Sequence, residues 1–300
     1  MSLEIQQIET PSKQGTSETE TDFSPFAKGA LAVLFIGCSF LVFNVGGYNS
    51  FIPSDLILLS RFAVVVILLI PTLILFRLEG TWNKYWKLSF SFWISSVGML
   101  LAWFFGRWYQ LIPGLSTSTV PGVAVAKVSE VLPIIAAILV GMYLVDKDFT
   151  QIYIRGGDLG KSIKLGLIAS LAALLPFVLV GGLGLTASLS TIISWIPWMC
   201  VFAASNAFME ELMVRGIFLK KYESILGQKQ SLLLTSVIFA IFHQAIIGYT
   251  DFVSFSIFMG MTFFLGLIWG YVMQKSDNIW GAVFAHTVAD IFFVLAVFGV

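Results

Sequence analysis

Runs of about 20 apolar residues recur along most of this chain, and each is long enough for a helix to cross the hydrocarbon of a bilayer. Backbone groups in lipid must find their hydrogen-bond partners within the same segment, which favours helices over open strands. Nine such segments lie near residues 29–46, 55–77, 88–111, 120–145, 165–185, 191–219, 231–249, 252–274 and 279–299. The sequence therefore predicts an all-α, polytopic membrane helix bundle of about nine spans.

The fourth segment allows a second topology. Lys127, Glu130 and Pro133 interrupt its apolar run, so residues 113–130 can instead form an interfacial or re-entrant piece. That alternative leaves eight spans. The sequence alone does not choose between the two topologies.

Basic residues are distributed unevenly between the predicted loops. The 17 Lys and Arg residues lie either in every second connection or within spans, and the other connections hold none. Those within spans are Arg61, Arg107, Lys127 and Arg215. Because cytoplasmic loops retain positive charge, we expect the N terminus in the cytoplasm of a multi-pass protein of the cell membrane.

The composition narrows the classes of protein that the chain can represent. Apolar residues make up 58% of the 300 positions and charged residues 11%, and the mean hydropathy is +0.91. These values exclude an ordinary soluble globular domain. The formal net charge is zero, which gives no reason to expect a nucleic-acid partner. Residues 1–27 are polar and are expected to form a disordered tail.

Charged residues interrupt the sixth segment near its predicted inner end. Glu210 and Glu211 are adjacent, and Arg215 follows Glu211 at the i, i+4 spacing that favours an ion pair within one helix. Glu210 points about 100° away round the helix, and it has no charged partner three or four residues further on. Another helix must therefore supply a partner for Glu210.

The two histidines of the chain lie in later apolar segments at a similar depth. Counted from the predicted inner end, Glu210, His243, His286 and Asp290 lie roughly 10–18 Å inside, from the helical rise per residue. Ionisable groups in a membrane are costly and usually functional. His286 and Asp290 share a helix face, as do Phe239 and His243, and either pairing can orient an imidazole. A Gly266-xxx-Gly270 pattern on the intervening segment is expected to let the two histidine helices approach.

These residues resemble three motifs of the CPBP intramembrane proteases, which include CAAX prenyl proteases and proteins of bacteriocin processing and immunity. The pattern of two glutamates followed by arginine matches residues 210–215, and the phenylalanine-xxx-histidine pattern matches residues 239–243. The histidine-xxx-asparagine pattern matches residues 286–290, with Asp290 in place of the amide. The resemblance covers roughly the last third of the chain. It implies a catalytic core over residues 191–300, preceded over 28–190 by membrane helices without a recognised motif.

The resemblance implies hydrolysis of a peptide bond in a membrane-anchored protein or peptide, within a bilayer and at a site opening towards the cytoplasm. Glu210 is then expected to activate water and His243 to hold that water. His286 is expected to stabilise the oxyanion with help from Asp290, while Glu211, Arg215 and Phe239 position the site. An ionised Asp290 would repel an oxyanion, so it must be protonated, orient His286 or bind a metal.

Metal dependence is left open by the sequence. Glu210, His243, His286 and Asp290 form a nitrogen and oxygen set that a divalent metal such as zinc accepts, but the same groups can activate water without metal. Two other functions use buried carboxylates and imidazoles: a proton-coupled transporter, and a non-catalytic immunity or scaffold protein in which the polar groups only lock helices together. The identity of the substrate, prenylated or not, is not encoded in any motif.

Overall fold

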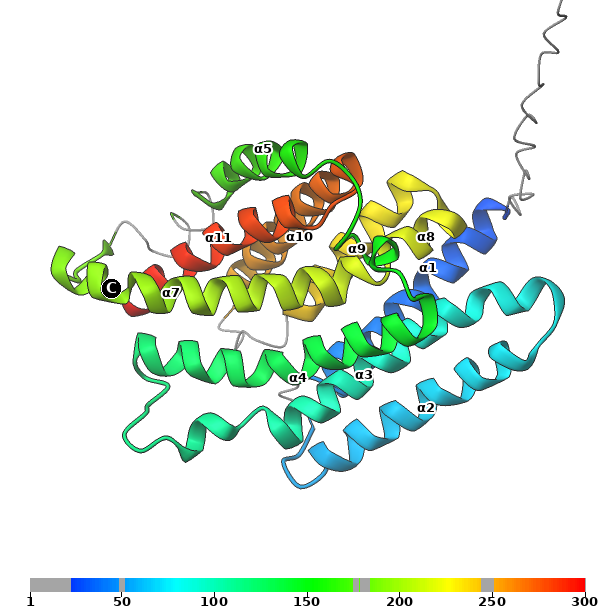
Figure 1. Cartoon of the computed structure of the whole chain (residues 1–300), viewed down its shortest axis with the longest axis horizontal. Helices are drawn as coiled ribbons and strands as arrows, with labels where there is room; N and C mark the ends of the chain where they lie inside the picture. The colour runs from blue at the N-terminus through cyan, green and yellow to red at the C-terminus, as the bar shows by residue number, and fades with distance from the viewer. Residues whose placement is uncertain (1–22, 49–51, 175–177, 179–183, 244–250, 300) are drawn as a thin grey trace, which may run out of the picture.

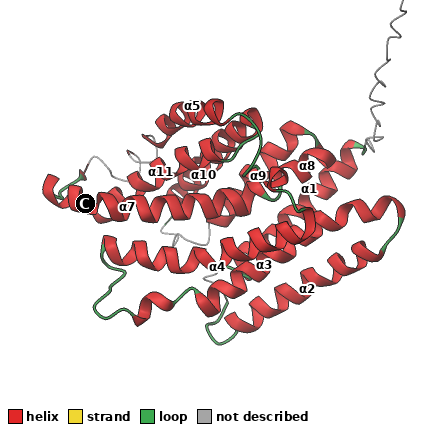
Figure 2. Cartoon of the chain, viewed as in Figure 1, coloured by secondary structure: helices red, strands yellow, loops and turns green. Residues whose placement is uncertain are grey.

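The computed structural model describes all residues except 1–22, 49–51, 175–177, 179–183, 244–250 and 300 (Figure 1). The regular structure in these described residues is helical throughout, as the sequence predicts (Figure 2). The long helices are α1 (Pro25–Phe40), α2 (Ile57–Arg77), α3 (Trp86–Phe105), α4 (Val120–Asp146), α7 (Leu189–Glu210), α10 (Phe252–Ser276) and α11 (Trp280–Phe298). The shorter ones are α5 (Leu159–Ser170), α8 (Leu219–Leu226) and α9 (Gln228–His243).

Short turns of other helix types extend several of these helices. Two are π-helical, η1 (Leu41–Val45) after α1 and η7 (Glu211–Gly216) after α7. The 3₁₀ turns are η2 (Gly80–Tyr85), η3 (Trp108–Leu111), η4 (Phe149–Ile152) and η5 (Leu171–Ala173).

Seven stretches of the described chain are long and apolar enough to cross a membrane. They are Pro25–Val45, Ile57–Arg77, Gly80–Leu111, Val120–Asp146, Leu189–Leu226, Phe252–Ser276 and Trp280–Phe298. The two other predicted spans, 165–185 and 231–249, correspond to the short helices α5 and α9, and parts of both lie outside the described residues. The membrane bundle is therefore confirmed, while nine as the number of spans stays a prediction.

The fourth predicted span forms one continuous helix. α4 runs for 27 residues, and its first turn is capped by Thr119, whose hydroxyl accepts a hydrogen bond from the Gly122 N–H at 3.2 Å. The charges that interrupt the apolar run neutralise each other, because Lys127 Nζ lies 2.8 Å from a carboxylate oxygen of Glu130. Of the two topologies that the sequence allows, the structure has the long helix.

The first helix begins inside the predicted polar tail. α1 starts at Pro25, where the Ser24 hydroxyl accepts a hydrogen bond from the Ala27 N–H at 3.3 Å. Residues 1–22 of the predicted tail lie outside the described residues. The helix therefore begins before the expected boundary at residue 27, and the disordered tail stays a prediction.

Helix α7 lies through the middle of the bundle, between α3 and α4 on one side and α5, α10 and α11 on the other (Figure 1). It packs against α4 and α11, while α9 packs against α10. Its inward face includes Asn206 and Glu210 among apolar neighbours. On α2, by contrast, many apolar side chains such as Val66 and Ile70 are exposed, as expected for a helix facing lipid. The central position of α7 places Glu210 within reach of several helices.

Candidate active site

Glu210 lies at the last residue of α7, directly before the π-helical turn. In that turn the Ile217 N–H donates to the Leu212 carbonyl at 3.1 Å, one residue further back than in an α-helix. Turns of this kind occur frequently at functional sites. The Glu210 side chain is buried, and only 3% of the residue is exposed. Its orientation is therefore set by protein contacts and not by bulk water.

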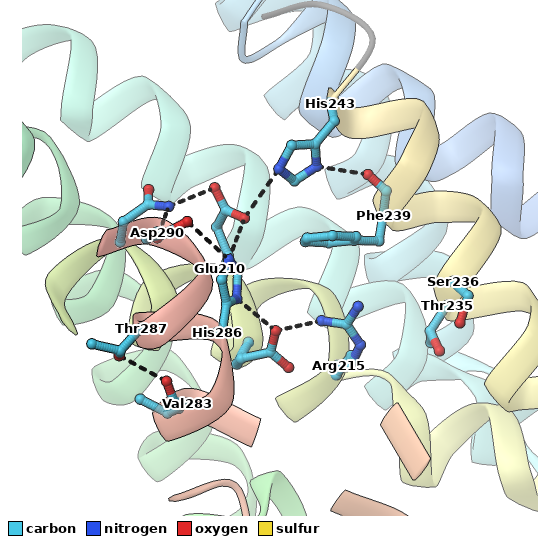
Figure 3. Close-up of polar contacts among 12 residues, drawn as sticks. Glu210, Arg215, Thr235, Ser236, Phe239, His243, Val283, His286, Thr287 and Asp290 are labelled. Carbon is cyan, nitrogen blue, oxygen red and sulfur yellow. Dashed lines mark hydrogen bonds and ion pairs between the residues drawn. The ribbon is translucent and has the colours of Figure 1, made fainter. Parts of the chain in front are cut away.

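Both histidines face the same oxygen of Glu210, as Figure 3 shows. The Nε2 atom of His243 lies 3.5 Å from Glu210 Oε2, and the Nε2 atom of His286 lies 3.7 Å from it. Among the described residues, this Oε2 atom has no hydrogen-bond partner. Asp290 joins them, with its Oδ1 atom 3.6 Å from His286 Nε2. The structure thus brings Glu210, His243, His286 and Asp290 together in one carboxylate–imidazole cluster, drawn from α7, α9 and α11.

The hydrogen bonds on the far side of each imidazole fix its orientation. His243 Nδ1 lies 2.9 Å from the carbonyl oxygen of Phe239, and His286 Nδ1 lies 2.9 Å from Glu211 Oε1. Since a carbonyl and a carboxylate only accept, each Nδ1 carries the hydrogen. A neutral imidazole then directs an unprotonated Nε2 at Glu210. If both imidazoles were neutral, acceptor atoms would face acceptor atoms in the cluster, so a proton, a water molecule or a cation is needed between them.

Glu211 neutralises Arg215 and at the same time holds His286. Arg215 Nη1 donates to Glu211 Oε1 at 2.6 Å, and both side chains are fully buried. This contact is the ion pair that their i, i+4 spacing predicts. The same oxygen accepts the hydrogen bond from His286. The pair therefore has a second task that spacing along one helix does not reveal, because His286 lies 75 positions away in the chain.

Aromatic rings enclose the imidazoles. The Phe239 ring centroid lies 4.2 Å from that of His243, the contact that their spacing predicts. Trp269 stacks on His286, with ring centroids 3.9 Å apart and planes 16° from parallel. The Arg215 guanidinium lies over Phe239, 4.5 Å from the ring centroid. These rings limit the rotamers of both histidines and exclude water from the Arg215 side of the cluster.

Gly266 and Gly270 of α10 permit this close arrangement. A Cβ atom at Gly266 would lie 3.2 Å from Arg215 Nη2 and 3.2 Å from the Cα atom of Ser236. At Gly270 it would lie 2.5 Å from Leu232 Cδ1. The small-residue pattern therefore brings α10 against α9 and against Arg215, so that Trp269 between the two glycines reaches His286.

Two residues at the cluster are absent from the site that the sequence predicts. Asn206 donates its side-chain amide to Glu210 Oε1 at 3.2 Å and to Asp290 Oδ2 at 2.9 Å. It precedes Glu210 by one helical turn, so a search four residues backwards as well as forwards would have found it. Trp269 is the other residue. The only sequence feature that points to it is its position between Gly266 and Gly270, and such patterns are common in membrane helices. An amide is thus present beside Asp290, although it comes from α7 instead of α11.

The predicted metal ligands, Glu210, His243, His286 and Asp290, all belong to the cluster. Among the described residues, however, no group of three or more His, Cys, Asp or Glu side chains is arranged to hold a metal ion. A metal role for these four residues stays a prediction.

The fold and the cluster define a multi-pass membrane protein with a buried site built from acid and imidazole groups. Residues 192–292 match the family model of the Rce1-like type II CAAX prenyl endopeptidases. This match confirms the resemblance to the CPBP intramembrane proteases for that part of the chain, and it supports intramembrane endopeptidase activity in general. It covers α11 up to residue 292 and nearly all of α7, but none of α1–α5. No curated protein and no solved structure gives a significant match to the chain.

Proposed function

We propose that this protein hydrolyses a peptide bond of a membrane-associated protein or peptide, with a water molecule activated by Glu210. The observation that carries this proposal is the convergence of two imidazole Nε2 atoms on one unpartnered oxygen of Glu210, at 3.5 and 3.7 Å. A water molecule between these atoms donates one hydrogen to Glu210 and the other to His243. The family match over residues 192–292 supports the same class of reaction.

In the proposed reaction, Glu210 takes a proton from the water while the water oxygen attacks the carbonyl carbon of the substrate. The resulting tetrahedral intermediate carries a negative oxygen. Glu210 then returns the proton to the amide nitrogen, the carbon–nitrogen bond breaks, and a carboxylic acid and an amine leave. His243 accepts a hydrogen bond from the water throughout, because its own Nδ1–H is engaged by Phe239.

His286 is assigned to the oxyanion in its doubly protonated form. Three carboxylates surround this imidazole, with Glu211 at Nδ1 and both Glu210 and Asp290 near Nε2. Their negative charge exceeds the single charge of Arg215, so the cluster retains at least one proton. Placed on His286, that proton lets Nε2–H donate to the developing oxyanion. Asn206 bridges Asp290 and Glu210 by donating to both.

The proposal is tested with purified full-length protein in lipid nanodiscs and a membrane-anchored fluorogenic peptide. We expect Glu210→Gln to lower the cleavage rate by about 10²–10⁴-fold, the range of general base catalysis. Glu79→Gln, at an exposed position after α2, is the matched control and should leave the rate unchanged. Cleavage that survives Glu210→Gln would contradict the assignment of the base. The absence of cleavage from every peptide tried would favour a transporter or a non-catalytic partner protein.

The same protein preparation tests the identity of the substrate and the requirement for a metal. We propose a substrate of the CAAX type or the bacteriocin type, and peptides trapped on the Glu210→Gln protein would identify it. Metal analysis of that sample, with activity measured before and after a chelator, would test the role of Glu210, His243, His286 and Asp290 as ligands.

The proposed orientation places the N terminus in the cytoplasm of a cell-membrane protein and opens the active site towards the cytoplasm. It is tested by cysteine labelling after Cys38 and Cys200 are replaced by serine. A membrane-impermeant maleimide applied to intact cells should label Ser116→Cys in the α3–α4 loop and should not label Thr81→Cys in the α2–α3 loop. The opposite labelling would invert the proposed topology.

A further inference from the structure

A second polar site lies among α2, α3 and α4, outside the region that matches the family model. A cavity of about 410 Å³ opens where α2 begins, α3 ends and α4 begins. Its wall includes Tyr48, Arg61, Trp103, Arg107, Lys127 and Glu130. We call it the arginine cavity. It collects three of the basic residues that the sequence places within spans, and the proposed mechanism uses none of them.

Positive charge exceeds negative charge in the arginine cavity. Three cations line it with one carboxylate, Glu130, which accepts hydrogen bonds from Lys127 at 2.8 Å and from the Tyr48 hydroxyl. The two arginines stack on Trp103, at 5.0 Å for Arg61 and 3.9 Å for Arg107. Within the described part of the chain, neither arginine forms a salt bridge with a carboxylate. Uncompensated charge at a membrane span is costly, so the cavity is suited to an anion.

The arginines present unused hydrogen-bond donors to such an anion. Arg61 donates to the backbone carbonyls of Met99 and Gly47, but its buried Nε–H has no partner among the described residues. The Arg107 side chain lies at the exposed end of α3. A guanidinium matches the planar, two-oxygen geometry of a carboxylate better than other side chains do.

The arginine cavity reaches α7, the helix that carries Glu210. Lys127 Nζ lies 6.0 Å from the ring centroid of Phe202. Phe202 shares a face of α7 with Asn206 and Glu210, because the three residues are spaced by four. In the proposed orientation α7 runs inward from Leu189, so an anion beside Lys127 lies about two helical turns from Glu210, on the side away from the cytoplasm.

We propose that the arginine cavity binds a free carboxylate of the peptide substrate and so positions the chain for cleavage at Glu210, an inference that rests on the proposed function. Met99, Ala102, Val123 and Ala126 add apolar lining for the neighbouring side chains. The volume lies within the range of small-ligand sites, about 300–1,000 Å³. It suits a few apolar residues better than the two acyl chains of a phospholipid. The contact of Lys127 with Phe202 on α7, the helix that carries Glu210, likewise favours a substrate over a bound lipid.

The test measures binding and not turnover. Full-length Glu210→Gln protein in phosphatidylcholine nanodiscs is titrated against a fluorescent pentapeptide of Ala, Val and Leu, with either a free carboxylate or an amide at its C terminus. We expect the free acid to bind about tenfold more tightly than the amide, the value of a charged hydrogen bond. Arg107→Gln should abolish this preference, and Arg107→Lys should keep part of it. Glu130→Gln should increase the preference, because it removes the negative charge of the cavity.

Arg77→Gln is the matched control, because Arg77 is exposed at the opposite end of α2. Equal affinity for acid and amide, or an equal loss of preference in the Arg77 and Arg107 variants, would overturn the proposal.

Nanodiscs containing phosphatidylglycerol form a second arm of the experiment. Phosphatidylglycerol could weaken the binding of the free-acid peptide and of the amide peptide equally, with Arg107→Gln removing this weakening. In that case the cavity holds a lipid phosphate, and the proposal fails. A preserved acid preference without cleavage by the wild-type protein would overturn the proposed function alone.

Discussion

The helices α1–α4 and the helices α7–α11 both carry charged side chains within the membrane spans, but the two regions satisfy these charges differently. On α4, Lys127 and Glu130 lie one turn apart and neutralise each other, with 19% and 27% of their side chains exposed. At the end of α7, Glu211 and Arg215 are fully buried, and Glu210 beside them faces imidazole nitrogens at 3.5 and 3.7 Å. A paired charge can serve a purely structural purpose. The carboxylate oxygen of Glu210 and the imidazole nitrogens, in contrast, need a proton or a water molecule between them, and that proton can take part in a reaction. The following predictions test this difference.

The largest effect on stability is expected from Glu211→Gln. This change leaves the buried Arg215 guanidinium without a counter-charge and weakens the hold on His286. Breaking a buried ion pair costs about 3–5 kcal/mol. Unfolding of the purified protein by SDS in mild detergent measures the loss. A variant of normal stability that has lost hydrolysis would instead assign Glu211 to the chemistry.

A smaller loss of stability is expected from Gly266→Ala. Its new methyl group would press on Arg215 and on the backbone of α9, where the available gap is 3.2 Å. Overpacking of this kind costs about 1–3 kcal/mol. Gly260→Ala on the same helix is the control, because nothing lies within 4 Å of a Cβ atom there. The same SDS titration should show Gly260→Ala to be neutral or slightly stabilising. Equal losses at both positions would refute the close approach of α9 and α10.

Asn206→Ala is expected to lower kcat about tenfold with little change in KM, because one charged hydrogen bond to Glu210 and one to Asp290 disappear. Asn206→Asp should be worse, since it adds a carboxylate to an already acidic cluster. The double variant Asn206→Asp with Asp290→Asn exchanges amide and acid and should recover part of the activity. If the double variant is no better than Asn206→Asp, the amide does not act by bridging the two acids.

The smallest effect is expected from Glu130→Gln on stability. The Lys127–Glu130 pair is partly exposed, and such pairs contribute about 1 kcal/mol or less. The Tyr48 hydroxyl can still donate to the side-chain oxygen of glutamine. Measured beside Glu211→Gln under the same conditions, this variant compares the two regions directly. A loss as large as that of Glu211→Gln would remove the distinction between them.

The sequence by itself determined the features that depend on one segment at a time. The length of each apolar run predicts a membrane helix because the backbone must close its hydrogen bonds locally. The contacts of Glu211 with Arg215 and of Phe239 with His243 follow from the pitch of one helix. The order of three motifs on three helices was enough to predict a resemblance of the last third of the chain to the CPBP proteases, which the match over residues 192–292 confirms.

Only the tertiary structure decided how the helices rotate against one another. Helices that are apolar all round give no periodic signal of their inner face, so the sequence could not select Asn206 as the amide that joins Glu210 to Asp290. It could not place Trp269 on His286, nor gather Arg61, Arg107 and Lys127 around one cavity. These contacts join side chains from different helices, and their geometry is set by packing at close-approach points such as Gly266.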